Sequence, residues 1–150
     1  MANIRALTFF ILFCLLVTHH PYLTNASRHH HHHRRHHPEY NPSGNHGILT
    51  VNNFARGGDG GGPSECDGKF HPLPERVVAL SSEWFNNGVL CGQRIRIKAK
   101  NGRSAVAKVV DECDTGRGCK HNIVDASKNV WKELGLNIDD GEVPIIWTKI

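Results

Sequence analysis

The chain has 150 residues, among them 18 Lys or Arg, 14 Asp or Glu and 12 His, and its formal net charge is +4. This length allows one domain of ordinary size, and from Gly47 onward 14 Lys or Arg are nearly balanced by 13 Asp or Glu. The basic excess therefore lies before the domain, which argues against nucleic acid as a partner, because nucleic-acid-binding folds carry a basic face themselves.

The first 26 residues have the pattern of a secretory signal peptide. One positive charge at Arg5 is followed by a run from Ala6 to Val17 that is apolar except for Thr8, and Ala26 ends a small-residue cleavage site. A signal anchor is the competing interpretation, but the run is well short of the ~20 residues that span a bilayer. We predict that residues 1–26 are removed and that the mature protein is exported, with no membrane partner.

Residues 27–46 form a separate, histidine-rich segment. Seven histidines lie within residues 29–37, with Arg34 and Arg35 among them and Arg28 just before them. The segment has no hydrophobic periodicity that could bury a core, so we predict a disordered linker. The alternative is a metal-binding or pH-sensitive tail, because the imidazole group gains charge near pH 6.5.

A predicted strand over 47–55 leads into the glycine-rich stretch "RGGDGGGPSECDGKFH" over 56–71, which has six glycines in sixteen residues. A phosphate-binding P-loop needs G-x-x-x-x-G-K-[ST] before a helix, whereas here Pro63 follows the glycines and no Gly-Lys-Ser/Thr is present. Glycine also permits positive φ and close approach of chain segments. The stretch is therefore predicted to be a tight crossover or a surface loop, not a nucleotide site.

Further strands are predicted over 76–82, 94–100, 105–110 and 143–150. The clearest pattern is the alternation that follows Cys91, and Asn101-Gly102 is typical of a tight hairpin turn. One face of this strand carries Ile95, Ile97 and Ala99, and the other carries Arg94, Arg96, Lys98 and Lys100. The basic stripe fits a solvated strand face better than a ligand face.

One helix is predicted within 125–135. Val130, Trp131 and Leu134 have helical spacing, Asp125 is the expected N-cap, and Gly135 the expected stop. Many short strands with glycine-rich turns and one helix indicate an all-β fold, either a small barrel or a sandwich.

Five cysteines are present, of which Cys14 lies in the predicted signal peptide. The remaining four, Cys66, Cys91, Cys113 and Cys119, indicate two disulfides in an exported protein, although four cysteines allow three pairings. Structural zinc sites favour close C-x-x-C pairs, and none occurs here, so no metal is expected in the domain.

Carboxylates are the remaining candidates for chemistry. Asp111, Asp114, Asp125, Asp59 and Glu65 lie in or beside predicted loops, and two acids can together hydrolyse a glycosidic bond. The structural alternative is that Asp111 ties down a loop while Asp125 caps the helix. No G-x-S-x-G nucleophile elbow is present. The structural alternative is favoured.

Five motifs occur together and in order: "LTVNNFARGGDGGGPSECDGKFH", "VVALSSEWF", "CGQRIRI", "NGRSAVAKVVDECD" and "NIVDASKNVWKELGL…GEVPIIW". With them, residues 47–150 resemble the kiwellin and ripening-related proteins, a family of secreted plant proteins. The resemblance implies an all-β, six-stranded double-psi β-barrel with one short helix, related to barwin and to the first domain of expansins. It also implies the disulfides Cys66–Cys91 and Cys113–Cys119.

The resemblance extends to the acids. Asp125 is similar to an aspartate of expansins and related endoglucanases, and Asp111 to the aspartate before a cysteine in barwin and expansins, but the upstream catalytic acid of those hydrolases has no assigned counterpart. The implied protein is a monomeric, non-enzymatic defence protein of the apoplast, without a cofactor, that binds a pathogen-secreted protein such as a fungal chorismate mutase. Binding to cell-wall polysaccharide is the alternative. The candidate binding residues are Asp111, Asp125, Asp59 and Arg56.

Overall fold

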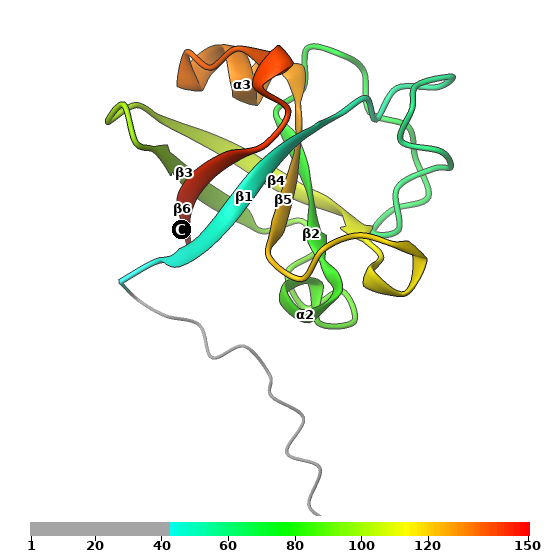
Figure 1. The fold of residues 1–150 in the computed structure, drawn as a ribbon. Helices are drawn as coiled ribbons and strands as arrows, with labels where there is room; N and C mark the ends of the chain where they lie inside the picture. Colours follow the sequence, from blue (N-terminus) through cyan, green and yellow to red (C-terminus); the bar gives the residue numbers. More distant parts are fainter. Residues whose placement is uncertain (1–42) are drawn as a thin grey trace, which may run out of the picture. The chain divides into compact units, whose positions relative to one another are not determined.

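The computed structural model describes residues 43–150 (Figure 1). The predicted signal peptide and all but the last four residues of the predicted histidine-rich linker lie outside the described residues. The elements are β1 (Asn45–Asn52), β2 (Val77–Ser81), α2 (Ser82–Phe85), β3 (Arg94–Ala99), β4 (Ser104–Cys113), η1 (Thr115–Arg117), β5 (Ile123–Ser127), α3 (Lys128–Leu134), η2 (Ile138–Asp140) and β6 (Val143–Lys149).

The six strands close into one barrel in the order β1-β5-β2-β4-β3-β6. Two neighbouring pairs, β1 with β5 and β2 with β4, run parallel, and the other pairs run antiparallel. Closure gives every strand a partner on both sides, so the barrel has no open sheet edge. The predicted six-stranded barrel is confirmed.

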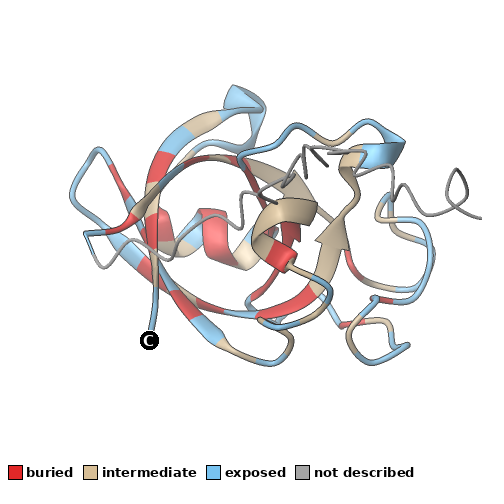
Figure 2. Cartoon of the chain, turned by 90° about the horizontal axis from the view of Figure 1, so that it is seen from below, coloured by how far each residue is buried: buried red, intermediate tan, exposed pale blue. Residues whose placement is uncertain are grey.

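The barrel interior is filled by the alternating apolar residues of the strands. On β3, Ile95, Ile97 and Ala99 are buried, while Arg94 and the other basic residues of the stripe are exposed. Figure 2 shows buried and exposed stretches alternating along the strands in this way. The stripe is a solvated strand face, as the alternation predicts.

The two α-helices lie at opposite ends of the barrel in Figure 1 and extend the same core. Val130, Trp131 and Leu134 of α3 are fully buried, and Phe85 of α2 is nearly so. Gly135 ends α3 with φ of 64°, as predicted. Within residues 43–150, no helix has both the length and the apolar character that a membrane crossing requires.

The prediction that Asp125 caps α3 is wrong. Residues Ile123–Ser127 form strand β5, and the N-cap is Ser127, whose side chain makes no capping hydrogen bond. Strand β5 pairs with β1 on one side and with β2 on the other, so its backbone is satisfied by two neighbours that lie far away in sequence. Local pattern alone does not reveal such a short central strand.

The barrel also begins earlier than predicted. Asn45 and His46, assigned to the linker, belong to β1, where they pair with Trp147 and Ile146 of β6. His46 is exposed and Asn45 is half-buried, so neither shows the apolar alternation that marks the rest of the strand.

A loop over 53–76 covers part of the outer surface of the barrel. It carries Phe54 onto a small second cluster with Val77, Ala79 and Val110, on the outward side of β2 and β4. The backbone N–H of Cys66 donates to the Val110 carbonyl at 3.0 Å. Two disulfides hold the neighbouring loops, and they are the pairings implied by the resemblance: Cys66–Cys91 and Cys113–Cys119.

Candidate functional site

A row of outward-facing residues crosses four strands beside the glycine-rich loop. In the strand register, Ala79 of β2 lies opposite Asp125 of β5 on one side and opposite Asp111 of β4 on the other, and Asp125 also lies opposite Thr50 of β1. Neighbouring strands are about 4.8 Å apart, so the Cα atoms of the two aspartates are separated by roughly 9.6 Å. The small Ala79 side chain leaves a shallow floor between two acids.

Asp125 is partly buried in this row. Its Oδ1 accepts a hydrogen bond from the Thr50 hydroxyl at 2.5 Å. Burial raises the pKa of Asp125, the charges of Asp59 and Asp111 raise it further, and hydrogen bonds from Thr50 and Asn52 act in the opposite direction. The protonated form of this carboxyl is therefore favoured more than in an exposed aspartate.

Asp111 is held by the backbone. Its Oδ1 accepts hydrogen bonds from the N–H of Glu65 at 2.8 Å and from the N–H of Glu112 at 2.9 Å. Burial raises the pKa of Asp111, while these two hydrogen bonds lower it. The interpretation that Asp111 ties down a loop is confirmed, because Glu65 belongs to the loop that covers β4.

The glycines bring Asp59 to the same place. A Cβ on Gly58 would lie 2.3 Å from the carbonyl oxygen of Asn53, and one on Gly60 would lie 2.7 Å from Oδ1 of Asn52. The chain can therefore pass over the end of β1 only without side chains at these positions. Asp59 lies between the two glycines, and its Oδ1 accepts from the N–H of Asn53 at 2.9 Å.

Asp59, Asp111 and Asp125 line one groove with a volume of about 490 Å³. The structure thus brings together three of the four candidate binding residues. Arg56 is not among the residues that line the groove. Its guanidinium carbon lies 4.6 Å from the ring centroid of Phe70, so it stacks within the loop and is exposed to solvent.

Two further charged residues of the groove, Glu112 and Arg117, were missed in the sequence, and Asp114, considered there as a candidate for chemistry, also lines the groove. Arg117 lies in η1 and pairs with Asp114 at 3.2 Å, and the Cys113–Cys119 disulfide closes this turn. The spacing "DECDTGRGC" was the available signal, but it does not show that the turn folds toward β5. The groove is therefore strongly acidic, and Arg117 is the cationic side chain among its described lining residues.

The chemistry open to this groove follows from its charge. Carboxylates and one guanidinium can bind hydroxyl groups, amides and cationic side chains. Within residues 43–150, no group of three or more His, Cys, Asp or Glu side chains is arranged to hold a metal ion.

The closed barrel with two parallel strand pairs is a double-psi β-barrel. Among solved structures, an expansin of Clavibacter michiganensis matches with 24% identity and a TM-score of 0.54, covering 70% of this chain and 49% of that one. A variant of that expansin in complex with cellohexaose matches with 22% identity, a TM-score of 0.53 and the same coverage. The Streptomyces papain inhibitor matches with 23% identity and a TM-score of 0.52, over 71% of this chain and 96% of the inhibitor. These similarities show the fold.

The Kiwellin-1 family model matches residues 37–150. The ripening-related protein grip22 of Vitis vinifera is 55% identical over 111 residues, 67% of this chain and 50% of that protein. Kiwellin of Actinidia chinensis var. chinensis is 52% identical over 110 residues, with coverages of 67% and 52%. The chain belongs to the kiwellin and ripening-related family, and it spans about half the length of these two relatives.

Proposed function

We propose that this protein is a non-catalytic plant defence protein, secreted to the apoplast, that binds and inhibits a protein released by a pathogen. The acidic groove with Asp59, Asp125 and Arg117 is the proposed contact surface. The carrying observation is that Asp111, the second partly buried acid of the groove, has a structural role, because it anchors the covering loop. Membership of the kiwellin family supports the proposal, and the two disulfides fit an extracellular location.

The hydrogen bonds of the acids argue against hydrolysis. Glycoside hydrolysis needs two carboxyl groups that flank the bond, one to donate a proton and one to act as base or nucleophile. Asp111 accepts two backbone N–H groups on one oxygen, and this anchors the covering loop. Protonation of Asp111 would weaken the attachment of the loop over 53–76 to β4. This carboxylate is therefore poorly suited to exchange a proton in each catalytic cycle.

The groove rim is suited to protein recognition. Arg117 has 88% of its side chain exposed, and its partner Asp114 is 42% exposed. Charged side chains at a rim determine partner choice and association rate. The Streptomyces papain inhibitor, which by its name blocks a protease, has the same fold, so this barrel can serve as an inhibitor scaffold in at least one other protein.

The proposal is tested by affinity capture from pathogen culture filtrate with the full secreted protein. A captured protein is then titrated against wild type, Arg117→Glu and Arg96→Glu, and its own activity is measured in the complex. Arg96 is exposed on β3, away from the groove, so it is the matched control. We expect inhibition by wild type, at least about tenfold weaker binding by Arg117→Glu and unchanged binding by Arg96→Glu.

Failure to capture a partner, capture of a partner that keeps its activity, or equal losses with the two variants would contradict this proposal. Equal losses would show that general electrostatic attraction, and not the groove, holds the partner.

A second candidate function is binding or modification of cell-wall polysaccharide in the same groove. The observation that favours it is the raised pKa of Asp125, a property of general acids, together with its position in an open groove beside Asp59. An expansin with this fold binds cellohexaose. Sedimentation with wall polysaccharides and reducing-sugar assays on wild type and Asp125→Asn decide this function. Unchanged sedimentation by the variant and no sugar release by wild type would exclude it.

A further inference from the structure

The outward side of β3 forms a basic surface together with the neighbouring part of β4. The name basic surface is used here for five exposed cations: Arg94, Arg96, Lys98, Lys100 and Lys108. In Figure 1, β3 lies at the left of the barrel, and the loop over 53–76 lies at the right. The basic surface shares no residue with the acidic groove, so the inference drawn from it does not depend on the function proposed for the groove.

The charges of the basic surface are not neutralised by acids of the barrel. Among residues 43–150, none of its five side chains forms an ion pair, whereas Arg76 pairs with Glu133 and Lys120 pairs with Glu142. Like charges on one sheet face repel each other, so their clustering lowers stability unless an anion binds to them. A surface with one sign of charge attracts partners of the opposite sign.

The cations form a straight and regular row. Alternate residues of a strand are about 6.8 Å apart, so the Cα atoms of Arg94, Arg96 and Lys98 span about 14 Å. Lys108 of β4 lies opposite Arg94 in the register and widens one end of the row. Because β3 pairs with β4 on one side and with β6 on the other, the row is held by a closed sheet. Such a row fits a linear chain that carries a negative charge on successive units.

One end of the basic surface is hollowed. Arg94 and Lys108 line a hollow of about 380 Å³, together with Arg76. The acid in the lining, Glu75, is already engaged, because its Oε2 lies 2.8 Å from Nδ1 of the buried His71. Arg94 and Lys108 are therefore available to an anionic group that enters the hollow. A guanidinium group can hold a carboxylate through two parallel hydrogen bonds.

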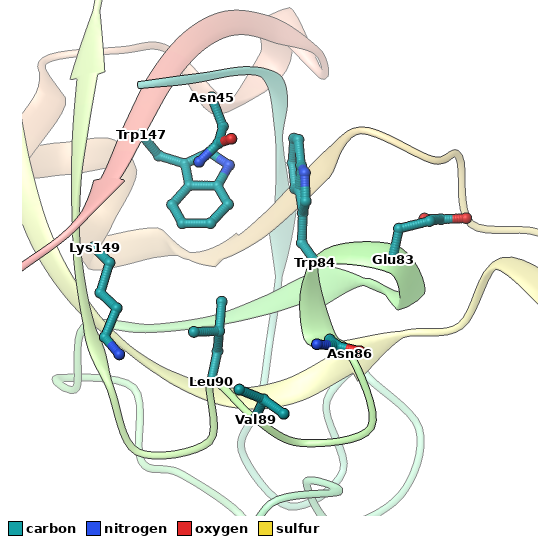
Figure 3. Close-up of a pocket in the computed structure, with 8 residues that line it drawn as sticks. All are labelled: Asn45, Glu83, Trp84, Asn86, Val89, Leu90, Trp147 and Lys149. Atoms are coloured by element: carbon teal, nitrogen blue, oxygen red, sulfur yellow. The ribbon is translucent and has the colours of Figure 1, made fainter. Parts of the chain in front are cut away.

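The side chains around the row are uncharged and include two hydroxyl groups. In the register, the outward neighbours of Arg96 and Lys98 are Ser104 and Val106 on β4, and Ile146 and Thr148 on β6. Trp147 and Lys149 of β6 line the pocket drawn in Figure 3 and are not part of this surface. The register thus places hydroxyl groups beside the cations but no aromatic ring.

This composition favours an acidic polysaccharide over a nucleic acid. Proteins that bind single-stranded nucleic acid stack its bases on aromatic side chains, which the basic surface lacks. The two disulfides fit a location outside the cell. Hydroxyl groups of Ser104 and Thr148 can bond to the hydroxyl groups of a sugar. The acidic groove would repel a polymer of carboxylates, so this site is distinct from the groove considered above for wall polysaccharide.

We propose that the basic surface binds a linear polysaccharide of uronate sugars. Arg94 and Lys108 hold one carboxylate at the hollow, and Arg96 and Lys98 hold carboxylates further along the polymer. The interaction is non-covalent.

The test is a calorimetric titration of the full secreted protein with polygalacturonate at pH 7.5. At this pH the carboxylates of the polymer are ionised, and the histidines before the domain are mostly neutral. We expect saturable binding by wild type and at least about fivefold weaker binding by Arg96→Glu. Lys69→Glu makes the same change of charge at an exposed lysine in the loop over 53–76, and it should bind as wild type does.

Two other polymers sharpen the test. Fully methyl-esterified polygalacturonate has the same backbone without the charge and should bind at least about tenfold more weakly. Single-stranded polythymidylate has the charge without the sugar acids and should also bind more weakly than polygalacturonate. Undiminished binding by Arg96→Glu, an equal loss with Lys69→Glu, equal binding of the ester, or polythymidylate binding as tight as that of polygalacturonate would each overturn the proposal.

Discussion

The outer surface of the barrel differs between β3 and the β2–β4–β5 side. On β3 the outward residues Arg94, Arg96 and Lys98 stand in water with nothing packed over them. On the other side, the loop over 53–76 adds a layer, and burial beneath it or beside it raises the pKa of Asp111 and Asp125. The difference teaches that shifted pKa values in this barrel arise where a loop covers the sheet and buries carboxyl groups, not where charged side chains stand in water.

The largest expected effect on the free energy of unfolding comes from the disulfide that holds the loop over 53–76 in place. Removing Cys66–Cys91 with paired serine substitutions frees a loop of 25 residues and should lower the free energy of unfolding by about 3.5 kcal/mol. Removing Cys113–Cys119, which closes only 6 residues, should cost about 2 kcal/mol. Denaturant unfolding measures both values. Equal losses would show that loop closure is not the main source of the stabilisation.

The apolar contact beneath the loop is the next largest effect. Phe54→Ala leaves a cavity over the outward cluster and should cost about 3 kcal/mol. Arg96→Ala on the uncovered face should change stability by no more than about 0.5 kcal/mol. Thermal or urea unfolding of the two variants makes the comparison, and similar values would mean that the loop does not pack as a true second layer.

Within the loop, two glycines provide a finer contrast. Gly58→Ala forces a Cβ against the Asn53 carbonyl and should cost about 2 kcal/mol. Gly62→Ala meets no atom within 4 Å and has no positive φ, so it should be close to neutral. Unfolding measurements test the pair. A neutral Gly58→Ala would show that the loop can move away from β1 at little cost.

The smallest expected effect concerns pH. The folded state raises the pKa of Asp125 above its ordinary 3.8, so the folded protein binds this proton more tightly than the unfolded chain does. The stability that this proton contributes is present at low pH and is lost as pH rises through the folded pKa. The Asp125→Asn variant cannot titrate at this position, and its amide oxygen can still accept the hydrogen bond from Thr50. The free energy of unfolding of the variant, relative to that of wild type, should therefore increase from pH 3 to pH 7.

Urea unfolding at a series of pH values measures this difference. Asp139→Asn, which removes the same charge from the exposed η2 turn, is the control. A difference between wild type and Asp125→Asn that stays constant with pH would contradict a raised pKa in the groove.

Much of the fold followed from patterns that are local in sequence. The alternation around Ile95 and Ile97, the Asn101-Gly102 turn and the helical spacing of Trp131 and Leu134 each predict an element that the structure contains. They succeed because one face of each element is buried and the other is solvated, which leaves a periodic trace. The number of strands and the closure of the barrel, in contrast, were predicted from the family resemblance and not from local patterns.

The candidate site was only partly predictable, because it depends on register. Asp111 and Asp125 flank Ala79 because β2 pairs with β4 and β5, which lie far from it in the sequence. The sequence does not reveal β5 as a strand, because it is short and has no solvated face that would produce an alternating pattern. Arg117 was missed because no local pattern shows that its turn, η1, folds toward β5. Helix α2 has four residues, too few for a periodic pattern, yet it carries Trp84 to its place beside β6.

The pairing of β1 with β5 and β6 has a consequence for how the chain acquires its structure. Thr50 and Asp125 are 75 positions apart, and β6 supplies the last neighbour for both β1 and β3. In a chain that emerges from its N-terminal end, β1 therefore has no partner until residues 123–127 of β5 are available, and its other edge stays unpaired until residues 143–149 follow. Such non-local pairing makes folding slow. Deleting β6 would expose two strand edges at once, and we expect aggregation of the shortened chain rather than a smaller domain.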